Sequence, residues 1–536
     1  MSIILNGIFK DDMVIQRDRE IRIFGVTSDV TDNRIKAVIT DSRRRHLSKA
    51  ETEEISEDGS FLLTLPPLSK GGPYTLRVSS TADTEKVVRR RIYSGEVWLA
   101  GGQSNMEYPL VRSEHARDEI NSISENNIHF YKVTAAGELD EAQKEAEKDS
   151  SWVMIDQETA RDMSAVAYYF SRKVNEYLSS KDEDDLHIGI IGCYLGSTDA
   201  ASWQSTESLE KTREGMRYIN DYLAEVENKS DQQYETELRM YNRLNENYNS
   251  KASKLIEDDP FITYSGIEKK IGGAPWPPPV GRKSLRRPGA LFDTMIGRVA
   301  PFGIRGVIFY LGEEDAQEHC EDYAAVFRSL IGDWRKVFMN DELPFLFCQL
   351  PMYTSKDRKY MGYDDLKWPK LRREQAKVAH EDSNAYMAVL TDCGEFDNPY
   401  PSDKKTPGER LAALALRFVY DQEEIPAVAP YVVDIRRGEG IEITFGGDYT
   451  NLNLITTFAS DDSGFEIAGE NGVFYPALAS VDFDGRTVIL RNSKVEVPAR
   501  VRYAYFSYGM ANLVADTGLA AAPFEVAIDN TIGEFY

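Results

Sequence analysis

Apolar, strand-like runs alternate with helical segments through the middle of this chain. The five clearest runs are residues 97–100, 188–192, 306–310, 345–349 and 388–390. Alternation of this kind is typical of a mostly parallel sheet covered by helices, and it predicts an α/β domain over residues 93–424. Open α/β sheets bind their ligands at the carboxyl ends of the strands. Side chains that directly follow these runs are therefore the first candidates for a functional site.

The segments on either side are rich in short strands without intervening helices. Residues 1–92 contain several such runs separated by turn residues, which predicts a small N-terminal β-sandwich. Strand-like runs return after residue 425 and predict a C-terminal β-rich domain over residues 425–536. Three domains also agree with the length of 536 residues, at ~150 residues per domain.

A highly charged stretch interrupts the α/β region. It carries apolar side chains at helical spacing, which predicts a long helical hairpin inserted at about residues 205–275. Trp276 and the three prolines that follow it then end the helical pattern. Two interpretations stay open: a solvated helix pair without chemistry, or a lid or a contact between copies in a homo-oligomer.

Composition narrows the classes of partner and the compartment. The formal net charge of −25 argues against nucleic acids and anionic membranes, because both require a basic surface. No run approaches the ~20 apolar residues that a membrane span needs. The start of the chain lacks a basic segment followed by a long apolar one, so we expect a cytoplasmic protein. The four cysteines lie far apart and are interpreted as buried thiols, not as disulfides or a metal site.

One serine directly follows the first apolar run. Gly101 and Gly102 allow the chain to turn sharply, which places the hydroxyl of Ser104 at the carboxyl end of the strand, where a nucleophile belongs. The segment is not Gly-x-Ser-x-Gly, so it does not indicate an ordinary α/β-hydrolase elbow. Because serine is also a preferred helix N-cap, a capping role is the alternative.

The run Gly-Gly-Gln-Ser-Asn-Met-Glu at residues 101–107 resembles the nucleophile block of the sialate O-acetylesterase family, within the wider SGNH hydrolases. Further similar blocks occur in the family's order along nearly the whole chain, at residues 13–17, 196–203, 305–313, 408–412 and 518–524. The resemblance implies an SGNH-type three-layer α/β/α catalytic domain with flanking β-rich domains. It also implies a carbohydrate O-acetylesterase without a metal or organic cofactor, acting on a small acetylated sugar or oligosaccharide.

The resemblance also implies roles for individual residues. Ser104 attacks the acetyl carbonyl and forms an acyl-enzyme that water hydrolyses. The backbone N–H of Ser104 and the loop amides around Gly196 and Ser197 match the oxyanion donors. Glu313 keeps its family position, and we expect it either to form a charge pair with Arg372 or to be purely structural. The predicted oxyanion or substrate-binding set is Gln103, Gly196, Ser197, Glu313 and Arg372.

The sequence departs from the family at two positions. The catalytic Asp-x-x-His segment aligns with Asp397 and Tyr400, so tyrosine stands at the position of the base. A tyrosine with a pKa near ~10 is neutral at pH 7 and cannot accept a serine proton as imidazole does. Leu311 stands where the family has a glutamine that completes the oxyanion site.

Two hypotheses about function follow. The first is an O-acetylesterase with a serine nucleophile, acting on sialic acid or on plant or host glycan oligosaccharides. The second, based on Tyr400 and Leu311, is a catalytically impaired SGNH relative that binds a glycan. For the first hypothesis, the alternative bases are His319, which lies in a loop just past a strand, and Asp397 or Asp392 acting directly on the serine.

Overall fold

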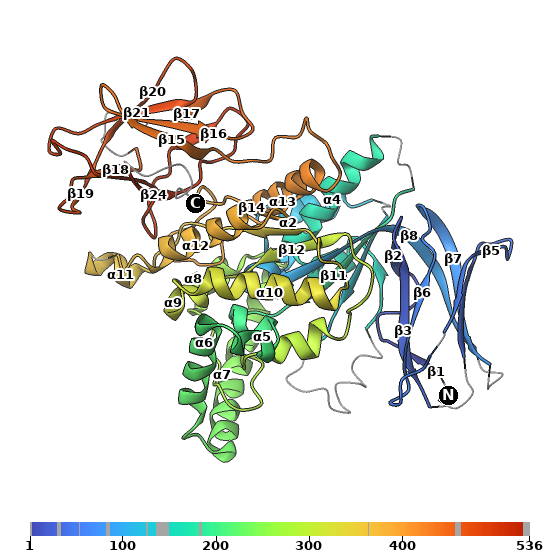
Figure 1. The fold of residues 1–536 in the computed structure, drawn as a ribbon. Helices are drawn as coiled ribbons and strands as arrows, with labels where there is room; N and C mark the ends of the chain where they lie inside the picture. Colours follow the sequence, from blue (N-terminus) through green and yellow to red (C-terminus); the bar gives the residue numbers. More distant parts are fainter. Residues whose placement is uncertain are drawn as a thin grey trace. The chain divides into compact units, whose positions relative to one another are not determined.

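The structure is a computed structural model. It describes residues 3–528, apart from residues 29, 31–33, 53, 82–85, 125–126, 136–149, 182–184, 363 and 456–462. The chain forms two compact units, shown as one ribbon in Figure 1. Unit 1 comprises residues 1–309 and 328–345, and unit 2 comprises residues 310–327 and 346–536. The protein is a mixed α/β structure with several separate sheets.

The N-terminal part of unit 1 consists of antiparallel strands. Strand β3 (Ile21–Thr27) lies between β1 (Ile3–Leu5) and β6 (Ser60–Leu65), and their side chains alternate between buried and more exposed positions. Strand β4 pairs with both β5 and β7, and β7 pairs with the long strand β8. The bounds of these four are Ile35–Thr40 for β4, His46–Glu51 for β5, Gly71–Ser80 for β7 and Lys86–Gly102 for β8.

Strand β8 continues from this region into the central sheet of unit 1. The domain boundary predicted between residues 92 and 93 therefore lies inside one continuous strand. The short strand β2 (Val14–Gln16) pairs in parallel with the middle of β8, at Tyr93 to Gly95. The N-terminal β-region and the central sheet consequently share the strand that leads to Ser104.

Two of the predicted strands, which lie in β8 and β11, pair in parallel in the central sheet. Strand β11 (Ile188–Tyr194) is buried along its whole length and pairs in parallel with β8 and with β9 (Ile128–Lys132). A continuous apolar run of this kind is typical of a parallel strand covered on both faces. Tyr194 lies opposite Gly102, so the carboxyl ends of β8 and β11 meet at one edge. Strand β10 (Val153–Met154) pairs with β9, and β12 (Gly306–Tyr310) follows β8 in the strand order.

Short helices surround these strands. Helix α4 (Ala165–Ser179) packs against β9 and β11, and Ser164 caps its amino end. The other helical segments before the insertion are α1 (Ser104–Glu107), η1 (Leu110–Arg112), α2 (Ala116–Ser122), η2 (Thr159–Asp162) and η3 (Ala200–Trp203).

Helices occupy the charged insertion, as its periodicity predicts. They are α5 (Thr206–Glu210), α6 (Arg213–Val226), α7 (Asp231–Asp258) and α8 (Tyr264–Ile271). Hydroxyl side chains cap all four, and Ser230 with Gln233 forms a complete capping box at the start of α7. A π-helical turn, η4 (Phe292–Ile296), follows them.

Unit 2 contains helices followed by β-sheets. The chain passes between the units within β12, α10 (Tyr323–Val337) and β13 (Phe345–Cys348). The remaining elements of the α/β region are α9 (Asp315–Glu318), α11 (Lys356–Met361), α12 (Lys367–Glu381), β14 (Ala385–Ala388) and α13 (Lys405–Phe418). Strand β14 ends at residue 388, where the sequence analysis places the start of a strand, because a turn from Asp382 to Ala385 directly follows α12.

The C-terminal part of unit 2, drawn in red in Figure 1, is rich in strands. One sheet has the order β15-β16-β21-β20, a second has the order β19-β18-β22-β24, and β17 pairs with β23. Apolar side chains from both larger sheets form a common core. The bounds are β15 Tyr431–Arg437, β16 Ile441–Gly446, β17 Leu452–Leu454, β18 Phe465–Ala468, β19 Phe474–Pro476, β20 Leu478–Val481, β21 Thr487–Arg491, β22 Arg500–Tyr503, β23 Leu513–Ala515 and β24 Phe524–Ala527.

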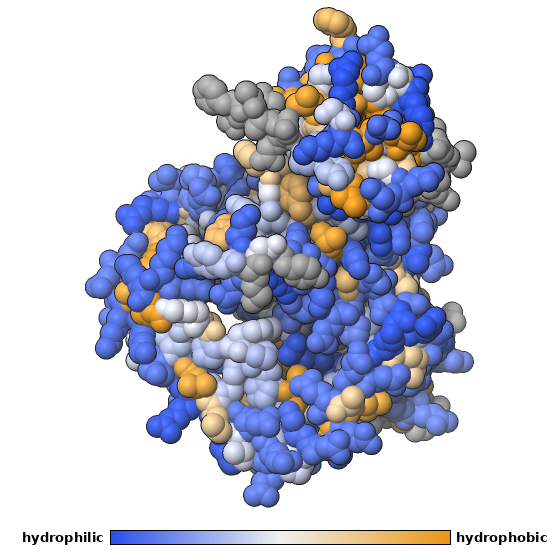
Figure 2. Space-filling view, turned by 90° about the vertical axis from the view of Figure 1, so that its left-hand side faces the viewer, coloured by the Kyte–Doolittle hydropathy of each residue, from blue (hydrophilic) through white to orange (hydrophobic). Residues whose placement is uncertain are grey.

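One face of the molecule is mostly hydrophilic (Figure 2). Figure 2 shows a face on which hydrophilic residues predominate and hydrophobic ones form small, separate areas. Among the described helices, none is long and apolar enough to cross a membrane.

Candidate active site

Ser104 lies at the junction between strand β8 and helix α1. Strand β8 ends at Gly102, whose φ of 137° is readily adopted by glycine but rarely by other residues. Gln103, whose side chain is buried, is the N-cap of α1, and Ser104 is the first helical residue. The alternative that Ser104 is itself the N-cap is therefore wrong. A side chain at Gly101 would also lie 2.8 Å from the Trp334 ring.

The loop after β11 brings Gly196 against Ser104. The N–H of Leu195 donates to the carbonyl of Gly102 at 3.1 Å, which extends the pairing of β11 with β8 by one residue. A Cβ atom built on Gly196 would lie only 2.8 Å from the hydroxyl oxygen of Ser104. The structure thus brings these two predicted site residues together, and it explains why position 196 has no side chain.

Internal hydrogen bonds fix the loop that carries Gly196. Ser197 adopts a left-handed conformation with a φ of 68°. The hydroxyl of Thr198 donates to the carbonyl of Leu195 at 2.8 Å and accepts the indole N–H of Trp203 at 2.9 Å. Trp203 is fully buried, so it anchors this loop from the core and does not offer a surface to a sugar.

The carboxylate of Glu107 accepts a hydrogen bond from the backbone amide of Gly196, which is one of the expected oxyanion donors. The N–H of Gly196 donates to Oε2 of Glu107 at 2.7 Å. The other carboxylate oxygen lies 4.0 Å from the ammonium of Lys132, whose side chain is half exposed. The expectation that Gly196 offers a free donor is therefore corrected by this bond. Glu107 was missed because its partner lies far along the sequence, although its position one helical turn after Ser104 was a usable signal.

The histidines of unit 1 do not supply a base for Ser104. His46 and His115 are exposed, and His129 and His187 hydrogen bond to each other at 2.8 Å through Nε2 and Nδ1. His129 lies in β9, and His187 precedes β11, at the edge of the sheet opposite Ser104. Burial lowers the pKa of both imidazoles to about 4. In the described part of unit 1, no histidine hydrogen bonds to Ser104.

Asp397 and Tyr400 belong to a loop of unit 2 held by its own side chains. Asp397 is exposed, and its carboxylate accepts the backbone N–H of Lys356 at 2.7 Å. The N–H of Tyr400 donates to the side-chain oxygen of Asn398 at 3.0 Å. Glu395 accepts the N–H and the hydroxyl of Ser402 at 2.6 and 2.9 Å. These bonds fix the loop backbone around Asp397 and Tyr400, the predicted catalytic positions.

Arg372 does not form the expected charge pair with Glu313. It is fully buried and donates to the sulfur of Met352 at 3.0 Å and to the carbonyls of Ala504 and Phe506. Burial lowers the pKa of Arg372 to about 9. The residue is directed toward the C-terminal β-region because the neighbouring carbonyls there offer acceptors. Glu313 is also buried.

Leu311 takes part in the structure through its backbone. Its side chain is buried, and its carbonyl accepts the hydroxyl of Tyr323 at 3.1 Å and the amide of Gln375 at 3.2 Å. An apolar side chain offers no donor to an oxyanion, as the sequence indicates.

His319 and Lys404 are two residues of unit 2 with nitrogen atoms that accept a proton when neutral. Nδ1 of His319 lies 3.7 Å from the carboxylate of Asp322, at the end of α9. Lys404 precedes α13, is fully buried, and donates to the carbonyl of Pro401. Burial lowers the pKa of Lys404 to about 8, although Glu313 opposes this shift. Such a lysine is partly neutral just above pH 7. The sequence analysis missed Lys404 because nothing in the local pattern reveals its burial.

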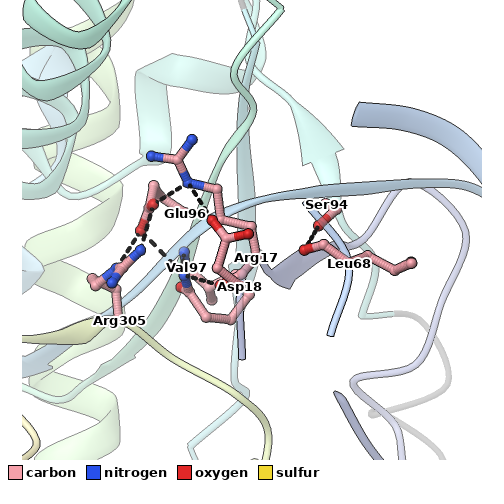
Figure 3. Close-up of polar contacts among 8 residues, drawn as sticks. Arg17, Asp18, Leu68, Ser94, Glu96, Val97 and Arg305 are labelled. Carbon is pink, nitrogen blue, oxygen red and sulfur yellow. Dashed lines mark hydrogen bonds and ion pairs between the residues drawn. The ribbon is translucent and has the colours of Figure 1, made fainter. Parts of the chain in front are cut away.

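The block at residues 13–17 stabilises the strand that leads to Ser104. Glu96 in β8 is fully buried and accepts hydrogen bonds from Arg17 at 2.5 Å and from Arg305 at 2.7 and 2.8 Å (Figure 3). Gln16 donates to Glu96 at 3.2 Å and accepts the N–H of Val97 at 2.9 Å. Burial disfavours the charge of Glu96, but the two arginines outweigh it and hold its pKa below the ordinary value.

The block at residues 408–412 contains an arginine that forms an ion pair in unit 2. Arg410 forms a two-bond pair with Asp392, both bonds being 2.6 Å long, and also donates to the carbonyl of Val389. The Gly-Glu-Arg-Leu segment at residues 408–411 thus holds α13 to the chain after β14. Asp392 is engaged in this pair.

Comparison with known proteins identifies the class. Residues 278–392 match the family described as carbohydrate esterase, sialic acid-specific acetylesterase. This match indicates similarity to carbohydrate esterases. The mouse sialate O-acetylesterase is 24% identical over 497 residues, covering 86% of this chain and 82% of the mouse protein. The rat sialate O-acetylesterase is 23% identical over 450 residues, covering 79% of this chain and 74% of the rat protein. The chain is thus similar over most of its length to sialate O-acetylesterases.

A solved structure shares the fold over nearly the whole length. A carbohydrate acetylesterase from Xanthomonas citri superimposes with a TM-score of 0.72 at 23% sequence identity. The match covers 98% of this chain and 99% of that protein. The fold is thus shared with a solved carbohydrate acetylesterase.

Proposed function

We propose that this protein is a carbohydrate O-acetylesterase of the SGNH type in which Ser104 is the nucleophile. The observation that carries the proposal is the position of Ser104 at the carboxyl end of β8, directly against Gly196. A hydroxyl in this place is partly exposed at a sheet edge, beside backbone amides that can stabilise negative charge. Similarity to sialate O-acetylesterases supports hydrolysis of acetyl esters on sugars.

The reaction proceeds in two steps. The oxygen of Ser104 forms a bond to the acetyl carbonyl carbon, and the sugar oxygen leaves with a proton. Water then attacks the acetyl-serine. This hydrolysis releases acetate and regenerates the hydroxyl of Ser104. The N–H of Ser104 is one donor to the oxyanion that forms in each step. Loss of one such donor costs ~10² to 10³ in rate in related chemistry.

The proton of Ser104 needs an acceptor other than the usual imidazole. Tyr400 aligns with the family's histidine position, so we propose testing Asp397 and His319 as alternatives.

The substrate is proposed to be a small acetylated sugar or oligosaccharide, from sialic acid or from plant or host glycans. The formal net charge of −25 disfavours long anionic polymers, because they are repelled before they reach the site. A single sugar carboxylate is a much weaker source of repulsion.

The test compares the wild type with Ser104→Ala on a chromogenic acetyl ester, on O-acetylated sialic acid and on acetylated xylo-oligosaccharides. We expect Ser104→Ala to lose activity by ~10³-fold or more, since residual rates after loss of a nucleophile come from binding and the oxyanion site alone. Ser180→Ala, at the exposed serine that directly follows α4, is the matched control and keeps full activity. Equal activity of the wild type and Ser104→Ala on every substrate contradicts the proposal.

A second candidate function is glycan binding without turnover, which Tyr400 and Leu311 favour. It predicts that wild type and Ser104→Ala bind an acetylated oligosaccharide equally in calorimetry and that neither hydrolyses it. It also predicts that Tyr400→His gains esterase activity. An active wild type that gains nothing from Tyr400→His supports the esterase with a different base.

A further inference from the structure

Glu107 is built into the same helical turn as Ser104 but faces the loop after β11. Its carboxylate accepts the N–H of Gly196 at 2.7 Å, and a Cβ atom on Gly196 would lie 2.8 Å from the Ser104 oxygen and 3.3 Å from Oε2 of Glu107. One glycine is therefore in contact with the proposed nucleophile and with this carboxylate. Gly196 has no side chain with which to pack, so the hydrogen bond is what holds it in place on this side.

We propose that Glu107 is a positioning residue that anchors the Gly196 amide and so sets the distance between the loop and Ser104. The inference rests on the proposed function of Ser104 as nucleophile. A backbone N–H carries one hydrogen, so the Gly196 amide is committed to Glu107 and does not bind the oxyanion. Other donors, among them the N–H of Ser104, stabilise that charge. Hydrogen bonds to a carboxylate are about twice as strong as neutral ones, which suits an anchor.

The surroundings of Glu107 moderate its negative charge. Lys132 lies 4.0 Å away at the carboxyl end of β9, and its ammonium also lies 5.5 Å above the ring of Tyr194. Tyr194 and Tyr264 are the neutral side chains whose ionisation Glu107 disfavours. A carboxylate that is bound to an amide and faced by a cation opposes an oxyanion nearby much less than a free one does. Lys132 is half exposed, so its contribution is smaller than that of the Gly196 bond.

The opposite role for the same geometry is inhibition of catalysis by Glu107. If the carboxylate blocks an oxyanion donor that catalysis requires, its removal frees the Gly196 amide and raises kcat. The anchor predicts the reverse, because removal lets the loop move away from Ser104. The sign of the change in kcat therefore separates the two roles.

The kinetic experiment compares Glu107→Ala, Glu107→Gln and the control Glu114→Ala in the full chain. We expect Glu107→Ala to lower kcat about 10-fold to 100-fold, since a hydrogen bond to a charged group contributes that much. KM changes far less, because Glu107 acts through the loop and not through ground-state binding of the sugar. Glu107→Gln keeps a carbonyl acceptor and retains most of kcat. Glu114 is exposed, and its replacement leaves kcat unchanged. A higher kcat in Glu107→Ala overturns the proposal.

Amide hydrogen exchange of the unliganded protein tests the anchor without any turnover. Peptides covering residues 194–199 should exchange about 10-fold or more faster in Glu107→Ala and at the wild-type rate in Glu107→Gln and Ser104→Ala. Unchanged exchange in Glu107→Ala overturns the anchoring role. An inactive wild type with this exchange pattern contradicts the proposed esterase function alone, so the two failures are distinguishable.

Discussion

Removing the charge of Glu96 is expected to destabilise unit 1 strongly, because Glu96 is fully buried between two arginines. Glu96→Gln keeps the size of the side chain and loses its negative charge. Arg17 and Arg305, whose side chains are only 11% and 18% exposed, then lose the buried carboxylate that both of them bind. Breaking a buried ion pair by removing one partner typically costs ~3–5 kcal/mol. We expect about 3 kcal/mol here, because both arginines keep some contact with water.

The assay is urea unfolding of the full chain, followed by tryptophan fluorescence, since Trp98 is buried in the same strand. Glu51→Gln is the matched control, because the Arg34–Glu51 pair is exposed and such pairs contribute at most ~1 kcal/mol. The pKa of Glu96 is lowered by folding, so its contribution is complete above the ordinary carboxyl pKa and disappears as the pH falls through the folded value. The difference between Glu96→Gln and the wild type therefore shrinks in acid. If Glu96→Gln and Glu51→Gln lower the free energy of unfolding equally at pH 7, the buried pairs of Glu96 do not contribute more than the exposed pair.

Three further predictions concern other parts of the chain. Gly196→Ala should abolish esterase activity in steady-state assays, because the new Cβ atom would lie 2.8 Å from the Ser104 oxygen; full activity contradicts this contact. Burial lowers the pKa of His129 to about 4, so the unfolded chain binds an extra proton between pH 4 and the ordinary value. Stability should thus fall by on the order of 3 kcal/mol as the pH drops from about 6.5 to 4, and chemical unfolding of His129→Gln should show a weaker pH dependence. Arg372→Leu should lower the midpoint of thermal unfolding, because it removes the buried bonds to residues 504 and 506, and an unchanged midpoint contradicts their importance.

Elements with regular hydrophobic patterns could be predicted from the sequence. Strand β12 has the predicted bounds, residues 306–310, because it is a short apolar run that follows Arg305 and ends just before Leu311 and Gly312. The junction at Ser104 could also be located, since two glycines follow a buried strand there. The hydrophobic pattern and the turn residues of a short segment are enough to predict the strand bounds and the junction.

The contacts of the candidate site could not be predicted in the same way. The bond between Glu107 and Gly196 joins residues far apart in the sequence, and it depends on the register of β11 against β8. Arg372 binds carbonyls of the distant C-terminal β-region, a choice that the spacing of Arg372 and Glu313 does not reveal. The lowered pKa of Lys404 arises from burial, which only the tertiary structure supplies.

The block at residues 13–17 illustrates the difference between resemblance and physical explanation. The resemblance locates the block but gives it no role. The structure shows that Gln16 and Arg17 hold Glu96 and Val97, at the point where β8 enters the central sheet. A segment near the start of the chain thus stabilises the strand that ends beside the proposed nucleophile.

The most direct test of the central claim is to detect the acetyl group on Ser104 during turnover. The wild type is mixed with an acetylated sugar, quenched in acid within its first turnovers, and digested for mass spectrometry. We expect the added mass of one acetyl group on the peptide that contains residues 101–107. This group should be localised to Ser104 and absent in Ser104→Ala. Turnover with the acetyl group on a different residue, or undiminished turnover by Ser104→Ala, would contradict the role of Ser104 as the nucleophile.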